Sequence, residues 1–405
     1  MNSGDTSFML LASALVMFMT PGLALFYGGL VRAKNVLATM MQSFICLGLV
    51  SLVWVVYGYT LAFGPDAGGI IGTLKYIGLR GVTLQPGPYS STIPDLLFCS
   101  FQLMFAVITP ALITGAFAER MKFSAFVWFT ILWSTLVYSP VCHWVWGGGW
   151  IGKLGALDFA GGTVIHINSG VAALAAALII GRRKGWRKEP ILPHNLPTSI
   201  LGAGILWFGW FGFNAGSAIA AGELATLAFF NTQVASGAAA VSWITAERLA
   251  RGKATTLGAV SGAVAGLVAI TPAAGFVGPI SAVVIGLVAG IVCYMFVLVK
   301  ERAGYDDALD VVAIHGFGGF WGALATGLFA STAVNPNAAN GLFFGNPGQF
   351  VTQFIAAAAV MVYSFVVSGV LLKIIDKTVG LRVREESEMT GLDLTEHSET
   401  GYTFG

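Results

Sequence analysis

Long stretches of this chain contain no Asp, Glu, Lys or Arg, and they limit the possible folds more than any other feature. These runs cover residues 6–31, 35–65, 96–118, 123–152, 159–181, 190–222, 224–246, 254–299 and 311–372. About 20 mostly apolar residues are enough for a helix to cross a bilayer. Only 10% of the chain is charged, against about a quarter of a soluble domain. The sequence therefore excludes a soluble enzyme, a nucleic-acid-binding protein and a disordered chain. It predicts an all-α polytopic membrane protein.

The lengths of these runs predict eleven transmembrane helices. Seven runs have the length of one span each. The run 254–299 is too long for one helix and is interrupted at 271–275, and the run 311–372 is interrupted at 335–337 and 346–347. These interruptions contain Pro, Gly or Asn, which favour turns. We expect a transmembrane domain over residues 1–376, with an eleventh helix at about 348–376, followed by a polar tail at 377–405.

The basic residues are divided unequally between the two sides of the expected membrane domain. Eighteen of the 21 fall in alternate connections or at the C-terminal end, and the other connections hold only Lys75, Arg80 and Lys153. Cytoplasmic loops carry the excess of Lys and Arg in membrane proteins. This pattern predicts a protein of the cytoplasmic membrane with its N-terminus outside and its C-terminus in the cytoplasm.

Ten of the expected helices divide into two sets of five, at about 6–181 and 190–333. Because five is odd, the two sets would cross the membrane in opposite senses, which is the inverted-repeat plan of many transporters. The fifth helix is expected to begin at Asp158 and to contain His166. The tenth is expected to begin at Asp310 and to contain His315. This matched placement of two histidines supports the repeat.

His166 and His315 are the two histidines expected deep inside membrane spans. An ionisable residue at that depth is by default a functional hypothesis, and a structural buried histidine is the alternative. Transition-metal sites usually have three or four ligands, and the sequence provides no third ligand, no HExxH motif and no carboxylate cluster in the spans. We therefore expect no metal, no cofactor and no enzymatic activity. The pair suits proton transfer or hydrogen bonding to a small polar molecule.

Three aromatic segments differ from the usual membrane-interface belt. Phe101 and Phe105 are four residues apart and share one helix face. The segment 143–150 is rich in Trp and Gly and includes Trp146, and the segment 210–217 includes Phe213 and Ser217. Together these residues could form a cage that binds a cation through the faces of its rings. Ordinary helix packing is the alternative interpretation.

Two aspartates are expected at helix starts. Asp158 can accept hydrogen bonds from the free N–H groups of the fifth helix, and its charge would also stabilise a cation arriving from outside. Asp310 is expected to do the same for the tenth helix, at the opposite face of the membrane.

Seven segments together resemble one known family. They are residues 21–29, 158–168, 193–197, 209–217, 314–316, 380–383 and 391–393. On these segments the chain resembles the ammonium transporter family (Amt/Mep/Rh), and in particular its bacterial and archaeal Amt-type members. The similarity runs from about residue 8 to the tail. It implies eleven helices in two inverted halves and a homotrimer in the membrane lipid with one pore per subunit.

The resemblance also implies roles for particular residues. Those that would recruit ammonium at the outer face are Phe101, Phe105, Trp146, Ser217 and Asp158. Phe105 and Phe213 would form a stacked gate below them. His166 and His315 would form the twin-histidine pair of the pore. Methylammonium would serve as an analogue of the substrate.

A charged ion loses several kcal/mol of hydration on entering a dry pore, and neutral ammonia loses far less. We therefore predict that ammonium is deprotonated near the gate, that ammonia passes both histidines, and that it is reprotonated inside. Neutral ammonia conduction and net ammonium transport both stay open, with or without a proton relay through the histidines.

An ammonium sensor with little transport of its own is the rival interpretation. The resemblance implies that the tail contacts neighbouring subunits and that a PII-type signalling protein regulates transport, whereas a simply solvated tail is the alternative.

Overall fold

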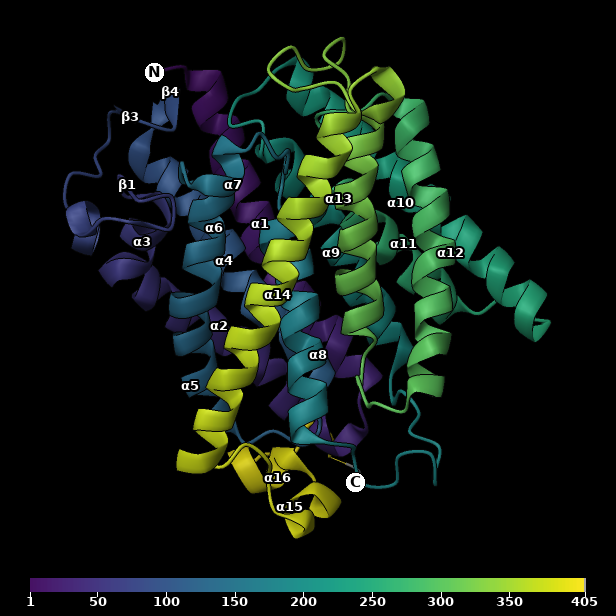
Figure 1. Ribbon diagram of the computed structural model, residues 1–405. Helices are drawn as coiled ribbons and strands as arrows, with labels where there is room; N and C mark the ends of the chain where they lie inside the picture. Colours follow the sequence, from purple (N-terminus) through teal and green to yellow (C-terminus); the bar gives the residue numbers. More distant parts are fainter. Residues whose placement is uncertain (404–405) are drawn as a thin grey trace.

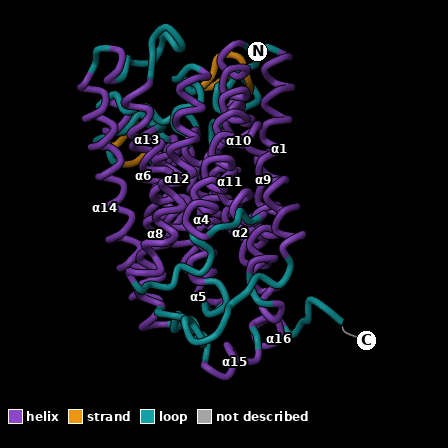
Figure 2. Tube along the Cα trace, turned by 90° about the vertical axis from the view of Figure 1, so that its right-hand side faces the viewer, coloured by secondary structure: helices purple, strands orange, loops and turns teal. Residues whose placement is uncertain are grey.

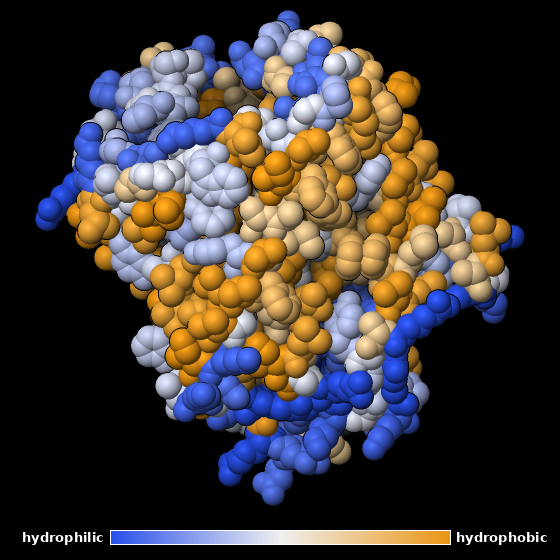
Figure 3. Space-filling model, in the orientation of Figure 1, coloured by the Kyte–Doolittle hydropathy of each residue, from blue (hydrophilic) through white to orange (hydrophobic). Residues whose placement is uncertain are grey.

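The computed structural model describes residues 1–403. Its long helices run side by side along one direction, and the two termini lie at opposite ends of the bundle (Figures 1 and 2). The surface carries a broad hydrophobic belt, with hydrophilic residues gathered above and below it (Figure 3). This distribution is that of a protein surrounded by lipid at its middle and by water at both ends.

Within residues 1–403, ten helical stretches are long and apolar enough to cross a membrane. They are Ser3–Leu30 (α1), Ala33–Phe63 (η1, α2, η2 and α3), Asp95–Phe117 (α4), Phe123–Lys153 (α5, η4, α6 and α7), Gly162–Ile180 (η5 and α8), Leu196–Gly216 (α9), Glu223–Arg251 (α10), Pro279–Ala303 (α12), Val312–Phe329 (η6 and α13) and Pro347–Thr378 (α14). Helix α11, at Thr256–Ile270, is apolar but has 15 residues. A helix of that length spans about 22 Å, which is less than the hydrocarbon core of about 30 Å.

The breaks predicted in the two longest charge-free runs are confirmed. Helix α11 ends at Ile270, and α12 begins at Pro279. Helix α13 (Gly318–Phe329) ends well before α14 begins at Pro347. The fifth helix begins later than expected, because three residues lie between Asp158 and the first helical residue, Gly162.

Short elements occupy the two ends of the bundle. The end that holds the N-terminus carries two antiparallel hairpins, β1–β2 (Asp66–Ala67 and Ile71–Gly72) and β3–β4 (Pro86–Gly87 and Ser90–Pro94), with η3 (Leu74–Leu79) and η7 (Leu342–Phe344). Asp66 pairs with Gly72 in the first hairpin, and Gly87 pairs with Ser90 in the second. The opposite end carries α15 (Glu385–Thr390) and α16 (Leu392–His397).

Glycines allow the helices of the bundle to approach closely. A Cβ on Gly202 of α9 would lie 2.3 Å from the backbone nitrogen of Phe26 on α1. A Cβ on Gly170 of α8 would lie 2.1 Å from the backbone nitrogen of Gly316 in η6. Such small residues bring helices together in membranes, where no hydrophobic effect drives them to associate. The second crossing joins the two helices that carry His166 and His315.

The tail is attached to the helical body by buried carboxylates. Asp393 accepts a hydrogen bond from the backbone N–H of Ala38 at the start of α2, at 2.8 Å. Glu388 accepts one from the N–H of Lys184 at 2.6 Å and one from Arg382 at 2.7 Å. Arg382 in turn donates to the carbonyl of Ile180 at the end of α8. The described part of the tail is therefore docked, which differs from the solvated-tail interpretation.

Candidate functional site

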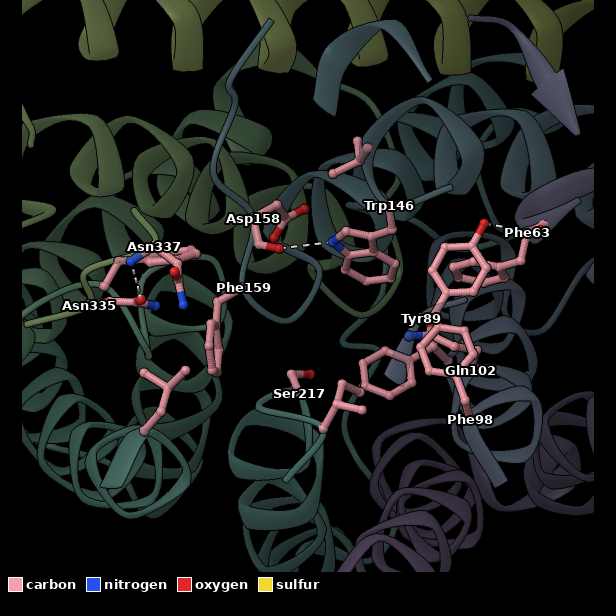
Figure 4. A pocket seen from close by; sticks show the side chains of 15 residues that line it. Phe63, Tyr89, Phe98, Gln102, Trp146, Asp158, Phe159, Ser217, Asn335 and Asn337 are labelled. Carbon is pink, nitrogen blue, oxygen red and sulfur yellow. Dashed lines mark hydrogen bonds between the residues drawn. The ribbon is translucent and has the colours of Figure 1, made fainter. Parts of the chain in front are cut away.

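A pocket opens at the end of the bundle that holds the N-terminus. Its volume is about 460 Å³, and its walls include Phe105, Trp146, Asp158 and Ser217. Figure 4 shows the indole of Trp146 beside the Asp158 backbone, with Ser217 below them at the end of α9. The structure thus brings together, from distant parts of the chain, four of the five residues expected to recruit the substrate.

Asp158 organises the start of the fifth span. One carboxylate oxygen accepts hydrogen bonds from the N–H groups of Gly161 and Gly162 at 2.8 and 2.7 Å, and the other accepts from Thr163 and Val164 at 2.8 and 3.1 Å. These N–H groups would otherwise lack partners at a helix start, so the capping role expected from the sequence is confirmed. Asp158 therefore fixes the turn that forms part of the pocket wall.

Trp146 is held in place by the same turn. Its indole N–H donates a 2.9 Å hydrogen bond to the backbone carbonyl of Asp158. Its ring stands edge-on to that of Phe105, with the ring centroids 6.1 Å apart. A tryptophan face is the strongest cation–π partner among the side chains. The pocket therefore presents a fixed aromatic wall to a small cation.

Ser217 adds a hydrogen-bond acceptor to the pocket. Its hydroxyl donates to the carbonyl of Phe213 at 2.8 Å. Because the hydroxyl hydrogen is used in this bond, the oxygen keeps its lone pairs for an incoming donor. An ammonium ion can donate such a hydrogen bond, whereas a potassium ion can not.

Two phenylalanines lie between the pocket and the histidines: Phe105 lines the pocket, and Phe213 lines the space around His166 and His315. The rings of Phe105 and Phe213 lie 4.3 Å apart between centroids, with their planes tilted by 35°. Phe101 is placed differently from the expectation. It is fully buried, it does not line the pocket, and it packs against Phe105 with centroids 4.8 Å apart. Phe101 supports the ring of Phe105 from behind.

His166 and His315 meet inside the bundle. Their Nδ1 atoms are 3.1 Å apart, which is a hydrogen-bond distance. One Nδ1 must therefore carry a hydrogen while the other accepts it. The ring of His166 lies nearly parallel to that of Phe213, with centroids 6.1 Å apart, and nearly parallel to that of Trp210 at 5.4 Å. The histidine pair thus lies directly next to the phenylalanine pair.

The space around the two histidines is narrow and apolar. It is lined by His166 and His315 together with aliphatic, methionine and aromatic side chains, among them Leu23, Ile108 and Val264. The volume open to the centre of a water-sized molecule is about 10 Å³, which is room for about one such molecule. The two imidazoles provide the polar atoms of this space.

Both histidines lie in π-helical segments. His166 is in η5 (Gly162–Ile167), and His315 is in η6 (Val312–Phe317). A π-turn inserts one residue into a helix and often marks a functional site. The two segments thus repeat the same local geometry on the two crossing helices.

The aspartate that corresponds to Asp158 is Asp307, and the expectation for Asp310 was wrong. Asp307 accepts a hydrogen bond from the N–H of Val312 at 2.8 Å, whereas the carboxylate of Asp310 contacts Lys300. Asp307 precedes His315 by eight residues, as Asp158 precedes His166. This equal spacing is the sequence signal that would have identified it.

Asp307 is buried, and one of its carboxylate oxygens has no hydrogen-bond partner within the described chain. Burial raises the pKa of Asp307 to about 6, although Lys300 acts in the opposite direction. The folded state therefore retains a proton on Asp307 that the unfolded chain has lost at the same pH. Between the ordinary value of 3.8 and about 6, stability falls as the pH rises.

We expect Asp307→Asn to remove this pH dependence and Asp307→Ala to destabilise the protein. Asparagine keeps an oxygen that can accept the Val312 N–H. Alanine leaves that buried N–H unpaired, at a cost of about 1–2 kcal/mol. Thermal unfolding of the purified protein between pH 4 and 7 measures both effects. A stability difference between the wild type and Asp307→Asn that does not change with pH would contradict the assignment.

Other residues of the site were not identified from the sequence. The wall of the pocket that contains Trp146 and Ser217 also includes Phe63, Tyr89, Phe98, Gln102 and Phe159. The rings of Tyr89 and Phe98 are stacked, with centroids 4.9 Å apart. Tyr89 lies in a loop between hairpin strands, where no periodic pattern marks it. Gln102 lies next to Phe101 in the sequence, which was its one available signal.

The fold and the site together define a multi-pass membrane transport protein, with a pocket at the end that holds the N-terminus and a narrow buried path next to it. Residues 7–402 match the model of the family described as the Ammonium Transporter Family. This chain therefore belongs to the ammonium transporter family, and the resemblance found in its sequence is confirmed.

Comparisons with individual relatives support this assignment over the full length of the chain. The chain is 55% identical over 403 residues to the ammonium transporter of Bacillus subtilis, covering 99% of each chain. It is 49% identical to ammonium transporter Amt1 of Archaeoglobus fulgidus, covering 100% of both. Its structure is similar to Mep2 of Candida albicans, with a TM-score of 0.90, 37% identity and coverage of 96% and 88%. It is also similar to a solved "Sensor Amt Protein", with a TM-score of 0.90, 30% identity and coverage of 97% and 98%.

Proposed function

We propose that this protein takes up ammonium across the cytoplasmic membrane through a pore lined by His166 and His315. The observation that carries the proposal is the continuity of the site. Phe105 lines the pocket together with Trp146 and Ser217 and packs against Phe213. Phe213 in turn lines the buried space that contains His166, with the two ring centroids 6.1 Å apart. Relatives that are about half identical over their whole length are named ammonium transporters.

The chemistry of the path favours a neutral molecule below the phenylalanine pair. An aromatic pocket with a hydroxyl acceptor binds an ammonium ion by cation–π attraction and a hydrogen bond. The space around the histidines is apolar and admits about one small molecule, so an intact ion would lose most of its hydration there. We propose that ammonium gives up a proton near Phe105 and Phe213 and that ammonia passes the histidines.

The histidine pair can act on ammonia in two ways. Each imidazole can hydrogen-bond the passing molecule, and the Nδ1–Nδ1 hydrogen bond can also carry a proton from one ring to the other. Currents measured on the purified, reconstituted protein show whether net charge crosses the membrane with each ammonia. An ammonium-dependent current supports net charge transport, and its absence supports conduction of neutral ammonia.

The proposed topology has eleven spans, with α11 as the short eighth span. The inverted repeats would cover residues 6–181 and 190–333, with the eleventh helix at 348–376 and the tail at 377–405. The equal spacing from aspartate to histidine in the two halves supports the repeat. The basic residues at the C-terminal end support a cytoplasmic C-terminus and an outer N-terminus. We further propose a homotrimer with one pore per subunit.

A sensor with little transport of its own is the second candidate function. It is favoured by the similarity to the solved "Sensor Amt Protein" and by the docked tail. The tail contacts α2 through Asp393 and the end of α8 through Arg382, so a protein that binds the tail could influence the helix that carries His166. We propose a PII-type signalling protein as this partner.

Uptake of labelled methylammonium, in cells that lack their own ammonium transporters, tests the proposed function. We expect saturable uptake that added ammonium inhibits. Trp146→Leu should raise the concentration for half-maximal uptake about tenfold, because a desolvated cation–π contact is worth about 1–2 kcal/mol.

The matched control is Trp128→Leu, which removes an exposed tryptophan from α5 and should leave uptake unchanged. Normal membrane levels of the protein without uptake would contradict transport and favour the sensor.

A further inference from the structure

Two glutamines lie buried in the membrane-spanning helix α14. Gln349 and Gln353 are four residues apart, so they share one face of the helix, and they expose only 5% and 1% of their surface. Moving an amide from water into apolar surroundings is costly unless its polar atoms are hydrogen-bonded. The partners of these two side chains inside the bundle therefore show what the glutamines do.

The amide of Gln353 holds one residue by both of its backbone polar groups. Its Oε1 accepts a 2.7 Å hydrogen bond from the N–H of Leu157, and its Nε2 donates one of 2.7 Å to the carbonyl of the same residue. Nε2 also donates to the carbonyl of Ala323 at 3.1 Å, and Gln349 donates to Oε1 at 3.3 Å. These four bonds use the two donors and two lone pairs of the Gln353 amide. We call the two bonds to Leu157 the glutamine clamp.

The clamped residue leads directly to the proposed recruitment site. Leu157 precedes Asp158 in the sequence, so the carbonyl that Gln353 binds belongs to the peptide group that joins these two residues. The carbonyl of Asp158 in turn accepts the indole N–H of Trp146, and Figure 4 shows this bond at the pocket. A chain of hydrogen bonds thus runs from α14 to the aromatic wall of the pocket.

Two further contacts fix the clamp. Gln349 donates a 3.0 Å hydrogen bond to the carbonyl of Gly155, two residues before Leu157. Ala323 belongs to α13, which directly follows the π-helical segment that contains His315. Helix α14 packs against both α13 and α8 (Figure 1). The segment before the fifth span is therefore held against two other helices of the bundle.

We propose that Gln353 is a positioning residue for ammonium recruitment and that Gln349 assists it. By holding Leu157, Gln353 sets the place of the Asp158 carbonyl and hence the way Trp146 faces the pocket. The carboxylate of Asp158 caps η5 through its own four bonds, so the histidine pair does not depend on the clamp. The inference rests on the function proposed above. It predicts a change in the concentration needed for uptake at an unchanged maximal rate.

Methylammonium uptake at a series of concentrations, in cells that lack their own ammonium transporters, tests the inference. Gln353→Met keeps the length of the side chain and removes its polar atoms. Gln349→Leu is the milder variant, because Leu157 keeps both of its bonds to Gln353. The control, Ser368→Ala, removes a buried 2.9 Å hydrogen bond between α14 and Trp133 of α5. It weakens the same helix at a contact outside the clamp.

We expect Gln353→Met to raise the half-saturating concentration about fivefold, Gln349→Leu to raise it about twofold, and Ser368→Ala to leave it unchanged. The maximal rate per protein in the membrane should equal that of the wild type in all three. The rise should stay below that of Trp146→Leu, because the indole is displaced and not removed. Since Gln353 acts through Trp146, the double variant Gln353→Met/Trp146→Leu should resemble Trp146→Leu alone.

Hydrogen–deuterium exchange of the purified proteins adds a measurement that needs no transport. Residues 155–161 should exchange faster in Gln353→Met than in the wild type and in Ser368→Ala, because the Leu157 N–H has lost its acceptor. Exchange equal to that of the wild type would overturn the clamp.

The uptake measurements can also overturn the positioning role. An unchanged half-saturating concentration in both glutamine variants, with or without a lower maximal rate, would leave Gln353 a structural role only. An equal rise in Ser368→Ala would show a general weakening of α14. If the wild type itself shows no saturable uptake, the proposed function is overturned and the role in recruitment with it, while the exchange result still decides whether Gln353 holds the turn.

Discussion

Asp158→Ala is expected to reduce ammonium uptake to background and to destabilise the protein. The carboxylate accepts four backbone N–H groups at the start of η5. Alanine leaves these groups without partners in a buried turn, at a total cost on the order of 3 kcal/mol or more. The same turn holds Trp146 through the carbonyl of Asp158 and leads directly to His166. One substitution would therefore disturb both the pocket that contains Trp146 and the histidine pair.

Three measurements separate these effects. Thermal unfolding reports the lost hydrogen bonds, membrane abundance reports folding in the cell, and methylammonium uptake reports function. Asp158→Asn keeps one acceptor oxygen and should fall between the wild type and Asp158→Ala. Glu223→Ala is the control, because it removes an exposed carboxylate at the start of α10. Normal uptake and an unchanged unfolding temperature for Asp158→Ala would contradict the assigned role.

Replacing the two histidines should have the second large effect. Each of His166→Leu and His315→Leu removes the Nδ1–Nδ1 hydrogen bond and leaves the partner ring unpaired in an apolar space. We expect each variant either to lower ammonium uptake or to admit potassium. The loss of uptake should be at least about tenfold, which corresponds to a rise of about 1.4 kcal/mol in the barrier to transport. The double variant removes both unpaired rings, so its effect should be smaller than the two single effects combined.

Uptake of methylammonium and of a potassium tracer, in the two single variants and the double variant, provides this double-mutant cycle. His194→Leu is the control, because that residue lies in the connection between α8 and α9, away from the pore. Uptake and selectivity equal to the wild type in all three variants would refute the role of the pair.

The helices were predictable because lipid imposes a simple condition. A span must bury every backbone hydrogen bond and expose apolar side chains, so charge-free runs mark spans, and Pro at 272, 336 and 347 marks their breaks. Helix α11 shows the limit of this reasoning. It has 15 residues and packs closely against α10 through Gly262 and Gly266, and the length of a charge-free run reports neither property.

The sequence alone pointed to the two histidines, the three aromatic segments and Asp158, and the family resemblance gave these residues their separate roles. Positions 146, 158 and 217 are far apart in sequence, and only the fold places them in one pocket. Phe101 shares a helix face with Phe105, as expected, but its ring packs against that of Phe105 and does not line the pocket. Asp310 directly precedes the charge-free run of the tenth helix, which is why the sequence pointed to it, whereas the backbone turns so that Asp307 accepts the Val312 N–H. The π-helical segments could not be predicted, since they change helix register without a residue pattern of their own.

Exchange of labelled methylammonium into liposomes tests the central claim most directly. The purified protein is reconstituted, the liposomes are loaded with unlabelled ammonium, and the label is added at acidic pH, where nearly all of the amine is charged and crosses lipid slowly. We predict rapid, saturable exchange with the wild-type protein and exchange at the protein-free rate with Asp158→Ala. If the wild-type protein exchanges methylammonium no faster than protein-free liposomes do, it does not carry ammonium.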